Sequence, residues 1–167
     1  MDADYFRFIF DHLYWARDRV LAAAGELSDE EFGRENGFTY GSVQGILVHA
    51  LDAEESWCSR FLGEPVAAAP SVDEIGSVEA LRTRWGAAEA PMRRFLAGVT
   101  EASLAEDFVL KRRNGEEHRT PLWVVLTHVV NHGTQHRSEA AEAVTMVGRS
   151  PGSLDFTTYV WGLGSGA

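Results

Sequence analysis

The chain has 167 residues, a formal net charge of −10 at pH 7 and an isoelectric point near 5.0. Hydrophobic residues make up 45% and charged residues 24%, a balance typical of one globular domain with a full core, so we predict a single domain over residues 1–167. An acidic surface repels nucleic-acid phosphates and anionic lipid, and the sequence has no run of 18 apolar residues, so we expect neither nucleic acid nor a membrane as a partner.

The sequence also indicates where the protein acts. Its single cysteine, Cys58, cannot form an internal disulfide, which argues against secretion. The N-terminal stretch MDADYFRF carries acidic residues where a signal peptide carries Lys or Arg. We therefore expect a cytoplasmic protein, with Cys58 as a structural helix residue.

Three amphipathic helices are predicted first along the chain. The first covers residues 4–24, where apolar residues recur at spacings of three and four. The second begins after Ser42, a residue type preferred at the N-cap, and ends at Gly63. The third covers residues 77–98, and Pro91 inside it predicts a kink or break, because proline removes one helical hydrogen bond.

The rest of the chain predicts a hairpin and one more helix. The Asn114-Gly115 pair is a strong turn signal, so we place a short β-hairpin at 107–120. A fourth helix follows over residues 120–147, and the aromatic tail is expected to pack back on the body. Four helices of similar length with little strand predict an all-α four-helix bundle, with the hairpin before its last helix.

The fourth helix carries three histidines, His128, His132 and His136, spaced four residues apart. On a helical wheel His132 and His136 lie within the apolar arc, whereas His128 falls outside it. Residues at i and i+4 have Cβ atoms about 6 Å apart, near enough for both rings to reach one ion. All three cannot share an ion, because two helical turns, about 12 Å, separate the first from the last.

A protein metal site normally needs a third ligand, and His49 in the second helix is the candidate, at the edge of that helix's apolar stripe. The alternative is that these are core or boundary histidines bonded to neighbouring polar groups, and spacing alone leaves both interpretations open. A zincin-type metalloprotease is disfavoured, because Gly133 follows His132 where that chemistry needs Glu.

Three segments resemble sequence motifs of the DinB family, a group of metal-binding four-helix proteins. They are DHLYWA at residues 11–16, HALDAEESW at 49–57 and PLWVVLTHVVNHGTQHR at 121–137. The last motif typically ends in His-Arg-Gly-Gln, whereas this chain has Ser138 and Glu139 after its His-Arg pair. The resemblance extends over most of the chain.

The resemblance implies an up-down-down-up four-helix bundle that often forms a homodimer. It also implies one divalent ion per chain, of nickel, zinc or iron, held by His49, His132 and His136. Related proteins in the superfamily are transferases and isomerases that depend on bacillithiol, mycothiol or glutathione. Many members of the DinB family have no established activity.

Three further residues are candidates for a role around the ion. His128 is close to the pair in the fourth helix, Asp52 follows His49 by three residues, and Glu139 follows His136 by three. Each could orient a ligand, a water or a substrate. The alternative for each is an ordinary polar side chain bonded to a neighbour or to water.

An ion on three neutral imidazoles keeps its full charge and has open positions, so it can lower the pKa of a bound thiol or water. Our leading hypothesis is a metal-dependent transferase that activates a low-molecular-weight thiol, such as bacillithiol, towards an electrophilic substrate in detoxification. Arg17 and Arg137 are candidates for binding the anionic groups of that thiol. The alternatives are a metal-dependent hydrolase and a non-catalytic metal-binding stress protein, so whether the chain is an enzyme stays open.

Overall fold

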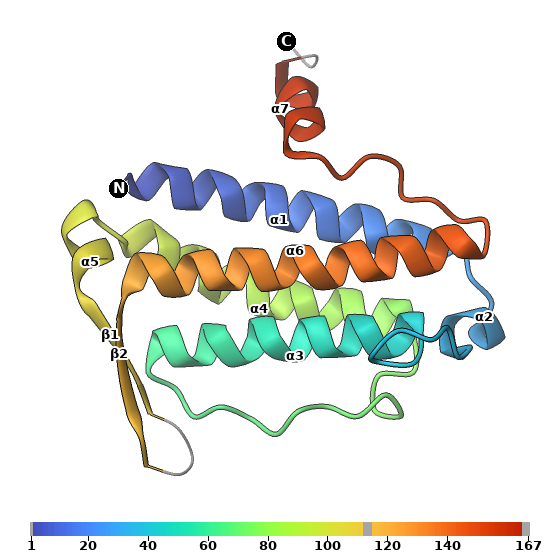
Figure 1. The fold of residues 1–167 in the computed structure, drawn as a ribbon, viewed down its shortest axis with the longest axis horizontal. Coiled ribbons are helices and arrows are strands. Elements are labelled where there is room, and N and C mark those ends of the chain that lie inside the picture. Colours follow the sequence, from blue (N-terminus) through green and yellow to red (C-terminus); the bar gives the residue numbers. More distant parts are fainter. Residues whose placement is uncertain (1, 112–114, 165–167) are drawn as a thin grey trace.

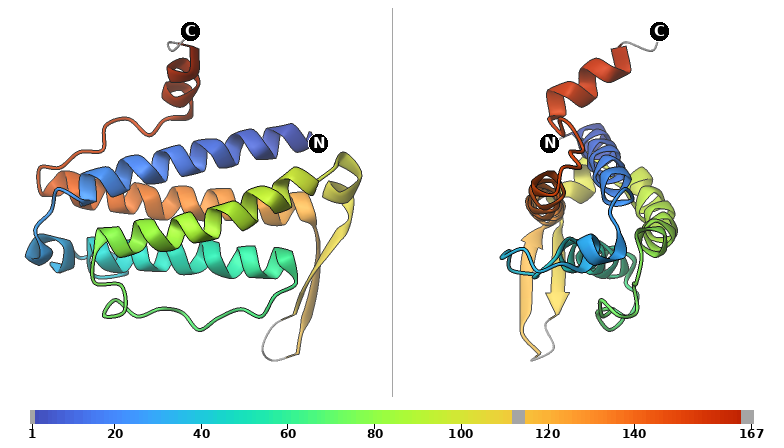
Figure 2. Two further views of the ribbon diagram at one scale, coloured as in Figure 1. Left: turned by 180° about the vertical axis from the view of Figure 1, so that it is seen from behind. Right: turned by 90° about the vertical axis from the view of Figure 1, so that its right-hand side faces the viewer.

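Four long helices lie side by side in the computed structural model, which describes residues 2–111 and 115–164 (Figure 1). Seen along their axes, they surround a common core, and each packs on two neighbours (Figure 2). The first and last of them run one way and the middle two run the other way, so the connection between the middle two returns along the outside. These helices are α1 (Ala3–Ala24), α3 (Val43–Leu62), α4 (Val78–Gly98) and α6 (Leu122–Met146).

The remaining elements are short and lie at the ends of the long helices. A two-stranded antiparallel hairpin precedes α6, as predicted, with Phe108 opposite Thr120. Of its predicted turn, Asn114 lies outside the described residues, while Gly115 has φ +88°, a left-handed conformation that favours glycine. The short elements are α2 (Asp29–Gly33), α5 (Glu101–Ala105), β1 (Asp107–Lys111), β2 (Glu117–Pro121) and α7 (Phe156–Gly164).

The predicted long helices agree closely with those observed, with one qualification at Pro91. α4 continues through Pro91, so the break that was one of the two expected outcomes is absent. A single proline costs a helix one hydrogen bond, and α4 buries Trp85 before it and Met92 after it, so packing on both sides holds the helix together. None of the described helices combines the length and apolar character needed to cross a membrane.

The C-terminal tail only partly packs back on the body. α7 stands away from the long helices in both views (Figures 1 and 2). Its Phe156 and Tyr159 rings contact Phe8 of α1, with centroids 5.6 and 5.7 Å away, and Tyr159 also contacts Trp15. No described residue of α7 is buried.

The hydrophobic core consists of two clusters, one at each end of the long helices. One cluster includes Val20, Leu47, Leu81 and Val144, and the other includes Phe6, Phe61, Leu96 and Leu126. On each long helix the residues of one cluster come before those of the other, with a gap between them. Polar side chains occupy that gap, and they determine the site described next.

Candidate metal centre

A layer of charged side chains divides the core between the two hydrophobic clusters. Each long helix contributes one residue: Arg17 from α1, Glu54 from α3, Glu89 from α4 and Arg137 from α6. Arg17 Nη2 donates to Glu89 Oε2 at 2.7 Å. Because burying a charge without a partner is costly, these opposite charges must lie at one level of the molecule.

Arg137 is the most constrained member of this charged layer. Its Nη1 lies 3.9 Å from Glu54 Oε1, and its Nη2 donates to Thr134 Oγ1 at 3.1 Å. Burial lowers the pKa of Arg137 to about 10, which leaves it charged at neutral pH, and burial raises the pKa of Glu54. A Cβ on Gly133 would lie 2.6 Å from Arg137 Nη1, so glycine at this position makes room for the guanidinium.

The burial of the two arginines corrects one interpretation made from the sequence. Arg17 is 6% exposed and Arg137 4% exposed, and both face carboxylates of the charged layer. Neither guanidinium is therefore available to bind the anionic groups of a thiol. The pairing of these charges could not be predicted from the sequence, because helical periodicity does not show which residues of other helices a side chain will meet.

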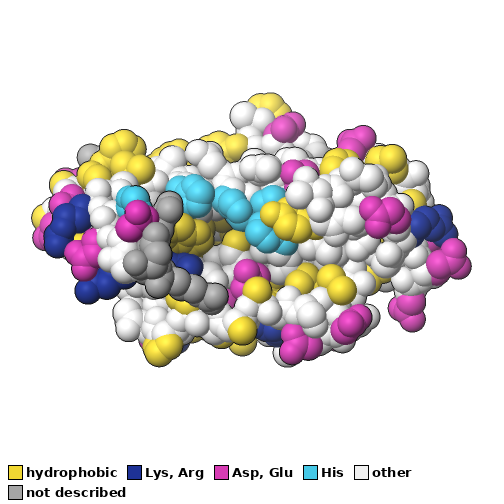
Figure 3. Space-filling model, turned by 60° about the horizontal axis from the view of Figure 1, so that its bottom comes forward, with side chains coloured by type: hydrophobic (Ala, Val, Ile, Leu, Met, Phe, Trp, Pro, Cys, Tyr) yellow, Lys and Arg dark blue, Asp and Glu magenta, His cyan; other side chains and the backbone are white. Residues whose placement is uncertain are grey.

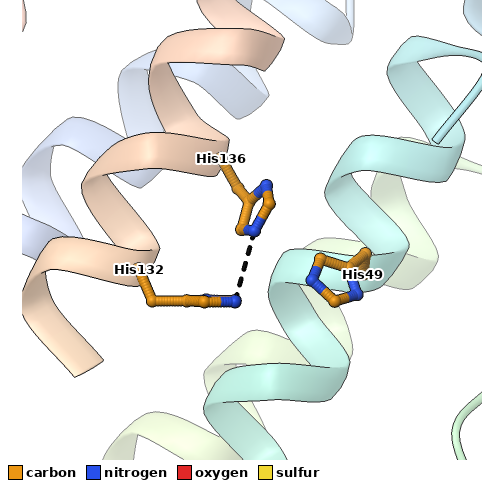
Figure 4. Close-up of side chains that lie close together, drawn as sticks. All are labelled: His49, His132 and His136. Carbon is orange, nitrogen blue, oxygen red and sulfur yellow. Dashed lines mark hydrogen bonds between the residues drawn. The ribbon is translucent and has the colours of Figure 1, made fainter. Parts of the chain in front are cut away.

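Three histidines meet across the gap between α3 and α6, beside the charged layer. His132 and His136 extend from successive turns of α6, with their Nε2 atoms 3.2 Å apart (Figure 4). His49 points at them from α3, with its ring centroid 4.6 Å from that of His136. One ligand nitrogen from each residue lies within 4.8 Å of the other two, so the three histidines are positioned to hold a metal ion.

The protonation of these rings suits a metal site. Burial, followed by the neighbouring imidazoles, lowers the pKa of His132 to about 4, and burial also lowers the pKa of His49. Both rings are therefore neutral at pH 7, the protonation state in which an imidazole binds a metal ion. Three imidazoles form a donor set that suits zinc, nickel or iron, so the residues present fit such an ion.

Glu139 fixes the orientation of one histidine. Its Oε2 lies 2.8 Å from His136 Nδ1, and His136 is only 3% exposed. A carboxylate in this position accepts a proton held on Nδ1, which leaves the Nε2 lone pair directed at His132 and His49. Of the three candidates for a supporting role, Glu139 is the one whose side chain lies at hydrogen-bond distance from a histidine of the group.

The other two candidates lie further out. His128 is exposed and outside the three-histidine group, with its ring centroid 5.7 Å from that of His132. Asp52 lines a pocket of about 230 Å³ that also includes His49 and Tyr40. Of the three histidines, His49 is the one that lines this pocket.

Tyr40 belongs to the site although the sequence analysis did not single it out. Its hydroxyl lies 2.8 Å from His49 Nε2, and its ring stacks on the His49 ring at 3.9 Å. The loop before α3 carries it there, and a Cβ on Gly45 would lie 2.0 Å from the Tyr40 carbonyl oxygen. The sequence signal was the glycine in the first turn of α3, which permits the loop to lie against that helix.

The model of the DinB family matches residues 3–164. The chain belongs to the DinB family. Protein DinB of Bacillus subtilis strain 168 is a relative that is 22% identical over 167 residues, with 92% of each chain covered. The DinB family membership and the three-histidine group together fit a metal-binding protein.

Proposed function

We propose that the chain holds one divalent ion on His49, His132 and His136 and activates a low-molecular-weight thiol for transfer to an electrophile. The observation that carries this proposal is the convergence of three imidazoles, two with lowered pKa values, from two helices. A divalent ion on neutral ligands supplies positive charge that lowers the pKa of a bound thiol or water.

The side chains around the histidines prepare the site for this role. Glu139 holds His136 in the tautomer whose Nε2 faces the group. Tyr40 covers His49 on one side and places a hydroxyl at the edge of the group, where it can donate to or accept from a bound thiol or water. The charged layer beside the site fixes the relative positions of α3 and α6 through Glu54 and Arg137.

The thiol in this proposal comes from outside the chain. Cys58 is buried, its thiol donates to the Ala88 carbonyl oxygen at 3.9 Å, and burial raises the pKa of that thiol. A small thiol such as bacillithiol would instead enter at the pocket beside His49. In the transfer, a sulfur–carbon bond forms, the leaving group departs with the electron pair of its own bond, and the thiol proton passes to solvent.

We also infer the assembly in which the site works. The directions of the long helices support an up-down-down-up four-helix bundle. Val160 and Leu163 of α7 are 38% and 57% exposed, which supports pairing of two chains as a homodimer. The single buried cysteine and the acidic charge support a cytoplasmic location.

The pocket beside His49 also bears on whether the protein is an enzyme. Its volume of about 230 Å³ leaves space beside His49 for part of a small molecule, which supports an enzyme over a non-catalytic metal-binding protein with a closed site. A metal-dependent hydrolase would use the same residues to activate water, and titration with a thiol distinguishes the two functions.

The test is spectroscopic. The protein is loaded with cobalt and titrated with bacillithiol, and thiolate coordination is expected to produce a charge-transfer band. His132→Ala is expected to lose both the ion and the band, whereas His128→Ala, the matched control on the same helix, keeps both. If the loaded wild type shows no band and no thioether product with any electrophile, the transferase proposal fails and the hydrolase becomes the better one.

A further inference from the structure

A second pocket lies one helical turn from the histidine group, between the hairpin and α6. Its volume is about 290 Å³, near the lower end of the range for small-molecule sites, about 300–1,000 Å³. Its walls come from α3, both strands and the first turns of α6. The lining residues are Trp57, Phe108, Leu110, His118, Thr120, Val124, Val125 and His128.

His128 connects this pocket to the candidate metal centre. Its ring lies 5.4 Å from Trp57, which forms a wall of the pocket, and 5.7 Å from His132, which belongs to the histidine group. Histidine side chains form a row across this face of the molecule, with apolar side chains beside them (Figure 3). A small molecule in the pocket could therefore extend one end past His128 to the metal centre.

The lining determines what kind of molecule fits. None of the eight described lining residues carries a permanent charge, and five of them are apolar or aromatic. A charged group would lose hydration against these apolar walls, whereas the burial of an apolar group is favourable by about 25 cal/mol per Å² of apolar surface removed from water. The pocket beside His49 differs, because the charged residue Asp52 lines it.

We propose that this pocket binds the apolar body of an uncharged electrophilic substrate and presents its reactive carbon towards the metal centre. This inference rests on the proposed thiol transfer and names the acceptor class for it. The chain would thus prefer aromatic or alkyl electrophiles over small polar ones. In the reaction with an aryl chloride, the thiol sulfur bonds to the ring carbon, chloride leaves with the electron pair of the carbon–chlorine bond, and the thiol proton passes to solvent.

The experiment fills the pocket and leaves the histidine group intact. Val124→Trp narrows the pocket from the side of α6, and Thr120→Trp narrows it from the side of the hairpin. Both residues are half-buried, so the larger side chain can extend into the pocket without displacing the core. Thr127→Trp is the matched control, because Thr127 is on the same helix, is also half-buried and does not line the pocket. Metal content and circular dichroism show whether each variant is folded and loaded.

Two readouts are combined. The first is kcat/KM with bacillithiol for 1-chloro-2,4-dinitrobenzene and for iodoacetamide, a small polar electrophile. We expect at least one filling variant to lower the value for the aryl chloride about 10- to 200-fold, the range for a hydrophobic pocket contact, and to change the value for iodoacetamide less than about two-fold. The second is the fluorescence of N-phenyl-1-naphthylamine, a neutral apolar probe, which should rise with wild type and the control but not with the filling variants.

The two readouts separate the possible failures. If both filling variants fold, hold metal and keep the aryl chloride activity, the inference is overturned. If they lower kcat/KM equally for both electrophiles, the pocket does not select the electrophile, and the inference is again overturned. If the wild type shows no thiol transfer but binds the probe in a manner that both filling variants abolish, the proposed function fails while the apolar ligand site stands. If neither transfer nor probe binding occurs, both fail.

Discussion

Gly45→Ala should both destabilise the protein and disturb the histidine group. The new Cβ would lie 2.0 Å from the Tyr40 carbonyl oxygen, well inside the 3.0 Å below which real contacts of this kind essentially do not occur, so the backbone before α3 must shift. Overpacking costs about 1–3 kcal/mol, and a severe backbone clash lies at the upper end. The helix preference of Ala over Gly returns about 1 kcal/mol, which leaves a net loss of about 2 kcal/mol.

Thermal unfolding of the metal-free protein measures this loss. For a domain of this length, about 2 kcal/mol corresponds to a Tm lower by about 4–8 °C. Gly86→Ala is the matched control, because Gly86 is also helical and nothing lies within 4 Å of its added Cβ, so Tm should stay level or rise by a few degrees, about 1–4 °C. A Gly45→Ala protein that melts at or above the wild-type temperature would show that the close approach of the Tyr40 loop is not a real constraint.

A variant of Tyr40 separates the effect of Gly45→Ala on stability from its effect on the histidine group. Tyr40→Phe keeps the ring against His49 and removes only the hydroxyl 2.8 Å from His49 Nε2. The imidazole nitrogen resonances of His49 should therefore shift in both Gly45→Ala and Tyr40→Phe, while the loss of stability is much larger in the glycine variant. Unchanged His49 resonances in Tyr40→Phe would contradict the observed hydrogen bond.

Three further outcomes are expected. Elemental analysis should find about one divalent ion per chain in wild type and in His128→Ala but none in His132→Ala, and equal content in all three would refute the ligand assignment. The pKa of His132 is about 4 in the folded protein and about 6.5 in the unfolded protein, so the unfolded state binds more protons between these two pH values. The Tm of the metal-free protein should therefore fall as the pH drops from about 7 to about 4. The decrease in Tm with pH should be smaller in His132→Asn. Arg137→Met removes the cation that acts most strongly on the buried Glu54 carboxyl, so chemical denaturation should show a loss of about 3–5 kcal/mol, much of which Glu54→Leu in the same chain should restore; a double variant as unstable as the single one would argue against the pairing.

The sequence by itself determined the long helices and the pair of histidines in the last one. Helical periodicity, N-cap serines such as Ser42 and the terminating Gly63 are local signals, so the limits of the helices could be predicted closely. His132 and His136 are four residues apart on one helix, and helical geometry alone places their rings together. The apolar stripe of the second helix made His49 the candidate third ligand, and the resemblance to the DinB family implied the same three histidines.

Only the tertiary structure decided what surrounds those histidines. Arg17 and Arg137 were interpreted as cofactor-binding residues, but four helices bring them into a buried layer with Glu54 and Glu89, and no local pattern shows which charges will meet across a core. Tyr40 reaches the site through a loop whose position depends on packing against α3. Such contacts join residues from separate elements, and their pairing follows from how the helices pack rather than from the period of any one of them.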